Sequence, residues 1–444
     1  MTNRAVQALA LALLSGVLQC CRQDPADTAR DDELVVISPM DETVRYEVSL
    51  AFEGYAKRKA GRDVSIRWQP ARGTGNIMRF LENEIKSAQA GRAVNIDVFF
   101  GGGPAHEKAR KMGMTEPAAL SEEALAAVPQ KLGGVNLRDP SAHWFGVTVS
   151  SFGIIYSRNG LANRGMEEPT SWKDLADPSY SNLLVIADPM ESGSARACYE
   201  MILQCFGWEE GWRILLRILA NAGSFTHSSG DIVREISSGQ AVAGMVIDTY
   251  AFAQIEKDGG DFTGFVLPRG ETTFTPDPVS IIKGTPRKEL AQLFIEFLLS
   301  REGQSLWFLP PGAPGGPEKY SLWHFPVRPD VYAAYAGRTT LKDNPFEAFA
   351  TLEYDEKKGA GRSRVLTFLF ETAAVQNKAR LKKAWRKIQL EPDEKLIRLF
   401  DEMPLGEKEG FELMETIRGP VETELEEEKY FRFFKDKYEE IIKN

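Results

Sequence analysis

The chain has 444 residues, too many for one ordinary hydrophobic core, so its length predicts two or more structural units. Hydrophobic residues make up 43% of the sequence and charged residues 26%, as in a globular protein rather than a disordered or membrane-embedded one. The formal net charge of -9 argues against a general nucleic-acid binder, which needs a basic face, but it leaves room for a local anion pocket.

The N-terminal segment is typical of an export signal. A single early cation precedes the apolar run Ala8–Leu18, which is too short for a permanent membrane helix. We therefore expect a signal peptide over residues 1–21, a polar tether over 22–32, and a location in the periplasm or cell envelope. Cys20 or Cys21 stands where a bacterial lipoprotein is lipidated, although the preceding residue is not the small one of that pattern. A simple cleaved signal peptide is the alternative.

Strand and helix patterns then alternate along the chain. Apolar runs and period-two alternation predict strands at 33–39, 63–70, 95–103, 144–159, 241–247 and 275–284. Apolar residues at helical spacing predict helices at 41–58, 76–89, 193–207, 209–222 and 287–307. This alternation predicts an α/β fold with a mostly parallel sheet wrapped by helices.

The composition changes after a Pro/Gly-rich stretch at 309–320. From about Tyr335 onwards the chain is charged, with apolar residues at helical spacing in its last 25 residues. We expect a helical extension packed on the globular body, and a docking surface for a partner is the alternative.

Several predicted strands end in loops that are rich in hydroxyls and glycines. In open α/β sheets, ligands sit beyond the carboxyl ends of the strands. Where such a loop opens a helix, its free backbone N–H groups and hydroxyls suit a phosphate, carboxylate or sulfonate. Taken singly, each loop is also explained as an ordinary N-cap or tight turn. The candidate binding residues are Ser38, Thr74, Gly75, Gly102, Ser192, Gly193, Ser194, Ser229, Asp248 and Tyr250.

Other chemistry is thinly represented. The four histidines have no ligand spacing, so zinc is not expected. The sequence has neither a nucleophile elbow nor a phosphate-binding P-loop, and His106 replaces the third glycine of a dinucleotide fingerprint. Cys198 and Cys205 lie on one face of a predicted helix, too far apart for a disulfide, and are expected to be core thiols. None of these sequence patterns indicates an enzyme or a bound cofactor.

The order of several segments resembles bacterial extracellular solute-binding proteins of ABC importers. They include "ELVVISP", "GRAVNIDVFFGGG", "VTVSSFGIIYSRN", "PTSWKDLADPSYSNLLVIADPMESGSA" and "SSGDIVREISSGQAVAGMVID", within residues 33–332. The resemblance implies a type II periplasmic-binding-protein fold whose two lobes close around a solute and then meet a membrane permease. Its boundaries would be lobe 1 at 33–145 and 277–334, lobe 2 at 146–276, and the extension at 335–444.

The segment "DTY" at Asp248–Tyr250 bears on the ligand. Ferric members of the resembled family hold iron with two adjacent tyrosines at this strand exit, because phenolates are hard donors. Here Thr249 precedes Tyr250, so one phenol is missing. Relatives for phosphorylated sugars and phosphonates carry an aspartate there instead. We therefore expect Asp248 and Tyr250 to face a small organic anion, and Asp248 as a helix cap is the alternative.

The expected function is capture of a small phosphate- or phosphonate-bearing solute by a monomeric, non-enzymatic binding protein. The first alternative is a ferric-ion-binding protein with Asp248 and Tyr250 as metal ligands. A scaffold or sensor on the same fold, using the helical extension to dock, is the second. An enzyme on this architecture would need a nucleophile or base with a shifted pKa in the cleft.

Overall fold

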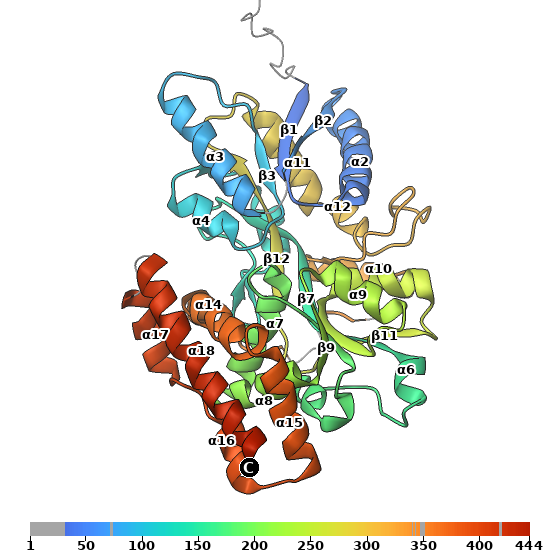
Figure 1. Ribbon diagram of the computed structural model, residues 1–444. Helices are drawn as coiled ribbons and strands as arrows, with labels where there is room; N and C mark the ends of the chain where they lie inside the picture. Colours follow the sequence, from blue (N-terminus) through green and yellow to red (C-terminus); the bar gives the residue numbers. More distant parts are fainter. Residues whose placement is uncertain (1–31, 72–73, 340, 342, 347–350, 417–419) are drawn as a thin grey trace, which may run out of the picture.

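The computed structural model describes residues 32–71, 74–339, 341, 343–346, 351–416 and 420–444. The expected signal peptide, almost all of the expected tether, and Cys20 and Cys21 lie outside these residues. Figure 1 shows two lobes stacked along the long axis of the molecule, with the C-terminal helices alongside the lower lobe. None of the helices in the described part of the chain combines the length and apolarity that crossing a membrane requires.

Lobe 1 is built on parallel strands, because β1 pairs in parallel with both β2 and β3. Its helices lie in two layers with separate hydrophobic cores, one containing residues of α2 and α11 and the other residues of α3 and α4. The main elements are β1 (Glu33–Ser38), α2 (Glu42–Ala60), β2 (Ser65–Pro70), α3 (Thr74–Gln89), β3 (Val98–Phe100), α4 (Ala105–Lys111), α11 (Lys288–Leu299), α12 (Arg301–Ser305) and α13 (Pro329–Ala334). The smaller ones are β4 (Thr115–Glu116), α5 (Glu122–Ala127), β5 (Lys131–Leu132), β6 (Val135–Asn136) and β13 (Phe325–Pro326).

Lobe 2 repeats the arrangement around parallel strands β10, β8 and β9. Its strands are β8 (Leu184–Ala187), β9 (Ala222–Thr226), β10 (Ala243–Ile247) and β11 (Thr263–Val266). Its helices are α6 (Arg158–Ala162), α7 (Gly193–Phe206), α8 (Trp208–Asn221), α9 (Ser229–Ser237) and α10 (Asp248–Asp258), with 3-10 turns at Trp172–Ala176 and Pro178–Tyr180. Cys198 is buried, and both it and Cys205 are free thiols, as expected.

Two long antiparallel strands connect the lobes. β7 (Phe145–Ser157) and β12 (Phe274–Ile282) pair along most of the shorter strand, with a register shift between Asp277 and Pro278. The main sheet runs in the order β2-β1-β3-β12-β7-β10-β8-β9, so these two strands stand at its centre. The first part of β7 pairs with β12 and with β13 of lobe 1, and its last part pairs with β10 and β11 of lobe 2. The strand predicted at 144–159 is therefore one of the two that cross between the lobes.

The C-terminal extension is helical, as expected, and it shares one hydrophobic core with lobe 2. Its helices are α14 (Glu356–Phe370), a π-helical turn (Glu371–Val375), α15 (Lys378–Leu390), α16 (Glu394–Asp401), α17 (Glu407–Thr416) and α18 (Pro420–Lys443). Figure 1 shows these orange and red helices beside α7 and α8. The expectation of extra helices packed on the body is therefore confirmed.

A lysine is buried inside this extension. Lys437 on α18 donates to the backbone carbonyls of Phe400, at 2.9 Å, and Glu402, at 2.7 Å, at the end of α16. Its ammonium also lies 4.9 Å from the ring centroid of Phe434. Burial lowers the pKa of Lys437 to about 7, although the nearby carboxylates of Glu402 and Asp401 oppose this shift. Lys437 thus joins α16 to α18 through a helix C-terminus and aromatic faces.

Two predicted elements differ from the structure. The strand expected at 95–103 is only Val98–Phe100, because the three following glycines adopt positive φ angles of 75°, 95° and 55° that leave the strand. The helix expected at 287–307 ends at Leu299, where Ser300 leaves helical geometry and caps the separate helix α12.

Candidate functional site

On lobe 2, three candidate serines lie together where two helices begin. Ser192 is the N-cap of α7, and its hydroxyl accepts from the Ala195 N–H at 3.2 Å. The Ser194 hydroxyl lies 3.1 Å from that of Ser192 and 2.6 Å from that of Ser229, the first residue of α9. The serine cluster, Ser192, Ser194 and Ser229, thus joins two helix N-termini whose N–H groups attract anions.

Tyr250 stands beside this cluster. It lies in the first turn of α10 and half of its surface is exposed. A side chain added at Gly230 of α9 would come within 3.7 Å of the Tyr250 ring, so the phenol borders the second residue of that helix. Gly193, also a candidate, is exposed at the start of α7. Tyr250 and Gly193 therefore both have access to solvent near the serine cluster.

Asp248 has a different environment from the one expected. Its side chain is fully buried, and its two oxygens accept from the backbone N–H groups of Ser151 on β7 and of Thr249, each at 2.7 Å. Burial raises the pKa of the Asp248 carboxyl well above its usual range, and the two N–H groups oppose that shift. In this conformation the carboxylate fastens α10 to a crossing strand, so direct contact of Asp248 with a solute stays a prediction.

On lobe 1, the glycine loop Gly101–Gly103 follows β3 and is held in place by the side chain of His106. The two ring nitrogens of His106 lie 2.6 Å from the Ser280 hydroxyl and 2.9 Å from the Gly101 carbonyl oxygen, and the ring stacks on Phe99 at 3.9 Å. Burial lowers the pKa of His106 to about 3, so the ring is neutral at physiological pH. His106 therefore serves as a rigid support for the Gly101–Gly103 loop.

The other lobe 1 candidates lie around this loop. A side chain at Gly102 would come within 3.4 Å of the Thr74 methyl group, and Gly75 is exposed at the start of α3. Ser38, in contrast, is buried, and its hydroxyl accepts from the Met40 N–H at 3.1 Å in the turn after β1. The structure thus brings Thr74, Gly75 and Gly102 together, while the Ser38 hydroxyl serves the turn. Solute contact by Ser38 stays a prediction.

The sequence analysis missed Asp277, a carboxylate on crossing strand β12. Its Oδ2 accepts from the Ser150 hydroxyl of β7 at 3.3 Å, and the Gly102 N–H of the glycine loop also donates to it. Burial raises the pKa of the Asp277 carboxyl, while the nearby His324 opposes the shift. Asp277 therefore stands where the crossing strands meet the lobe 1 loop, and it is electrostatically coupled to Asp248 of lobe 2.

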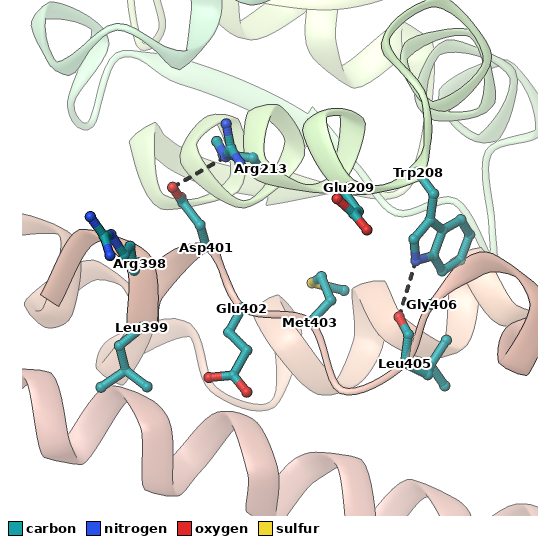
Figure 2. Close-up of a pocket in the computed structure, with 10 residues that line it drawn as sticks. All are labelled: Trp208, Glu209, Arg213, Arg398, Leu399, Asp401, Glu402, Met403, Leu405 and Gly406. Carbon is teal, nitrogen blue, oxygen red and sulfur yellow. Dashed lines mark hydrogen bonds and ion pairs between the residues drawn. The ribbon is translucent and has the colours of Figure 1, made fainter. Parts of the chain in front are cut away.

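An open groove of about 610 Å³ lies away from the serine cluster, between α8 and the segment joining α16 to α17. Figure 2 shows Asp401 facing Arg213, with 3.3 Å between the charged groups, and the Trp208 indole donating to the Leu405 carbonyl at 3.0 Å. These contacts hold the extension on lobe 2. Ser192 caps the N-terminus of α7 and Trp208 follows its C-terminus. The serine cluster and the groove therefore lie at opposite ends of this helix.

Comparisons with known proteins agree with this arrangement. Residues 94–310 match the family described as "Bacterial extracellular solute-binding protein". The chain is 31% identical over 268 residues to the phosphoglycerate transport regulatory protein PgtC of Salmonella typhimurium, covering 60% of this chain and 62% of that protein. It is 25% identical over 169 residues to a putative 2-aminoethylphosphonate-binding periplasmic protein of the same organism, covering 37% and 46%. The matched regions thus span less than two thirds of these relatives.

Solved structures show the same fold. The periplasmic binding protein AfuA from Actinobacillus pleuropneumoniae, with fructose-6-phosphate bound, gives a TM-score of 0.56 at 22% identity, covering 77% of this chain and 98% of that one. The apo ferric ion-binding protein A of Pasteurella haemolytica gives 0.57 at 18% identity, covering 77% and 97%. The two-lobed type II periplasmic-binding-protein fold and the resemblance to extracellular solute-binding proteins are thus confirmed. The lobe boundaries expected from the sequence stay predictions.

Proposed function

We propose that the protein is an exported solute-binding component of an ABC importer that captures a small phosphate- or phosphonate-bearing solute between its lobes. The serine cluster carries this proposal, because it joins hydroxyl groups to the N-termini of α7 and α9 in one place. Two relatives are named for phosphoglycerate transport and for binding 2-aminoethylphosphonate, and these names support the same chemistry. The solute would then pass to a membrane permease.

The groups of the cleft suggest how such a solute is held. Phosphate oxygens accept from the hydroxyls of Ser194 and Ser229 and from the free N–H groups of the two helices. The remaining end of the solute faces Asp277, whose carboxyl group accepts from a hydroxyl or an ammonium. We therefore propose a solute with a phosphate or phosphonate at one end and a hydrogen-bond donor at the other.

The ferric alternative receives less support from the residues present. Tyr250 is followed and preceded by residues without a phenol, and the described part of the chain holds no group of three His, Cys, Asp or Glu placed for a metal ion. Fe³⁺ needs several hard oxygen donors together. Iron as the transported ligand stays a testable alternative, with Asp248 and Tyr250 as its named ligands.

Native mass spectrometry and calorimetry test the proposal. The protein purified from its own periplasm is weighed under native and denaturing conditions, and then titrated with 3-phosphoglycerate, 2-aminoethylphosphonate, inorganic phosphate and ferric citrate. We expect binding of at least one of the first two compounds, and a monomeric native mass. An excess mass of one iron atom that is lost on acidification would contradict the anion proposal.

Site variants sharpen this experiment. Ser194→Ala and Ser229→Ala should each weaken the affinity about tenfold, or about 1.4 kcal/mol, because each removes a hydroxyl that donates to the anion. Ser237→Ala is the matched control, since this serine lies at the other end of α9 and bonds Asp258 at 2.8 Å. Equal affinities in all three variants would contradict the placement of the anion at the serine cluster.

A sensor is the second candidate function. The relative PgtC is named as a regulatory protein of phosphoglycerate transport, and this chain carries a large extension outside the matched residues 94–310. A deletion strain separates the two functions: loss of labelled 3-phosphoglycerate uptake with normal transporter expression supports the importer component. Loss of transporter expression, restored by supplying the transporter from a constitutive promoter, supports the sensor.

A further inference from the structure

The chain passes between the lobes a third time, after β7 and β12. Helix α13 (Pro329–Ala334) belongs to lobe 1, whereas α14 (Glu356–Phe370) packs in the core of lobe 2. Residues 351–356, which we call the strap, lead into α14 and include its first residue. The strap contacts both lobes through hydrogen bonds, so it is more than a covalent linker.

On the lobe 1 side, the strap lies against the hairpin formed by β5 and β6. The Tyr354 N–H donates to the Gly133 carbonyl at 3.0 Å, and the backbone and side-chain amides of Asn136 donate to Glu356 Oε2 at 3.4 and 3.1 Å. The contact is close, because a side chain at Gly133 would come within 2.6 Å of the Thr351 hydroxyl. The paired glycines of the hairpin thus allow the strap to approach its backbone.

On the lobe 2 side, the strap is joined to α7, the helix that begins at the serine cluster. The backbone N–H and carbonyl of Asp355 bond the side chain of Gln204 at 2.8 and 3.0 Å. One turn earlier on α7, Glu200 forms a buried ion pair with Arg362 of α14 at 2.5 Å. The C-terminal end of the strap is therefore attached to lobe 2 and should move with α7.

The two sides differ in how firmly the strap is anchored. Its hydrogen bonds to Gln204 and to Asn136 are both exposed to solvent, but on the lobe 2 side the following helix α14 is also held to α7 by the almost fully buried Glu200–Arg362 pair. A rotation of the lobes about β7 and β12 moves the hairpin relative to α7. We expect the hairpin contacts to break first. Breaking an exposed hydrogen bond costs less free energy than breaking a buried ion pair.

We propose that the strap is a third link between the lobes, which restrains their rotation and favours the arrangement described by this structure. In that arrangement the candidate binding residues Gly75, Gly193 and Tyr250 are exposed to solvent. Where solute binding draws the lobes together, closure works against the strap, so the strap lowers the solute affinity. This second part rests on the proposed function, whereas the restraint itself does not.

Glu356→Ala in the full-length chain tests the restraint, because it removes the acceptor of both Asn136 donors. Small-angle X-ray scattering without any added solute should show a smaller radius of gyration, or a mixture containing a more compact species, in the variant. Glu394→Ala is the matched control: this glutamate also begins an extension helix, but it pairs with the exposed Arg398 and not with lobe 1. Asn136→Ala is a second variant that leaves α14 intact.

Titration with 3-phosphoglycerate gives the second readout. We expect both strap variants to bind it about three- to tenfold more tightly than the wild type, while Glu394→Ala binds equally well. Unchanged scattering in both folded strap variants would overturn the restraint. Changed scattering in a protein that binds no 3-phosphoglycerate would support the strap and count against the proposed solute.

Discussion

Replacing Arg362 by methionine should strongly destabilise the protein. The Arg362 guanidinium donates to Glu200 Oε1 from two nitrogens, at 3.0 and 2.5 Å, and to Glu407 at 2.6 Å. It also lies 5.9 Å from the Trp208 ring centroid. The side chains of Arg362 and Glu200 are only 1% and 4% exposed, so neither charge can be solvated by water.

The size of the effect follows from this burial. Arg362→Met leaves the Glu200 carboxylate buried without its cation, and the second carboxylate oxygen already has no hydrogen-bond partner. Breaking a buried pair by removing one partner costs about 3–5 kcal/mol, a large part of the total of about 5–15 kcal/mol for a typical domain. Removing both charges, in Glu200→Leu with Arg362→Met, should recover most of the loss, because replacing a whole buried pair by apolar residues is often neutral.

Urea unfolding followed by far-UV circular dichroism measures these differences. Arg398→Met serves as the control, since its ion pair with Glu394 is 81% and 87% exposed and such pairs contribute at most about 0.5 kcal/mol. The reasoning is refuted if Arg362→Met changes the free energy of unfolding by less than about 1 kcal/mol. It is equally refuted if the double variant is no more stable than the single one.

The remaining predictions concern a buried lysine, a glycine and Asp277. For Lys437, the folded pKa of about 7 lies below the ordinary 10.5, so the unfolded state binds more protons between these values and stability rises with pH across that window. The free energy of unfolding of the wild type minus that of Lys437→Met should therefore increase from pH 7 to 10, and a flat difference would contradict the lowered pKa. Gly303→Ala should cost about 1–3 kcal/mol in urea unfolding, because the added methyl carbon would lie 2.1 Å from the Phe297 carbonyl oxygen, whereas Gly260→Ala meets nothing within 4 Å and should be neutral. Asp277→Asn should weaken 3-phosphoglycerate binding about tenfold in calorimetry with inorganic phosphate binding unchanged, and an equal loss for both would place Asp277 at the phosphate end.

Local patterns predicted which of the candidate residues lie together on lobe 2, and long-range contacts decided the surroundings of the others. Ser192, Ser194 and Ser229 follow strands or begin helices, so the rule that ligands sit at strand ends found them together. Asp248 obeys the same rule but turns towards the Ser151 N–H, 97 residues away in the chain, and no local pattern reveals such a partner. Asp277, in contrast, was not predicted as a candidate at all. It lies between two prolines in a segment that the sequence predicts only as a strand.

The C-terminal extension was also predicted only in part. Its helices were predictable because apolar residues recur at helical spacing near the C-terminus. The surface that they cover was not, because helical spacing shows which face is apolar, as at Phe434 and Tyr438, but not which element that face packs against. Only the packing against α8 and the π-helical turn shows which face is covered.

The shared core of lobe 2 and the extension also sets an order of events during synthesis. This core includes residues from Phe152 to Ile441, so it cannot be completed until the last helix has left the ribosome. Domains otherwise tend to fold as units in the order in which they are made. Lobe 2 must therefore wait about 180 residues after its final strand, Thr263–Val266, for the segment that closes it. If the protein is exported as proposed, this delay leaves the chain time to cross the membrane before lobe 2 is complete.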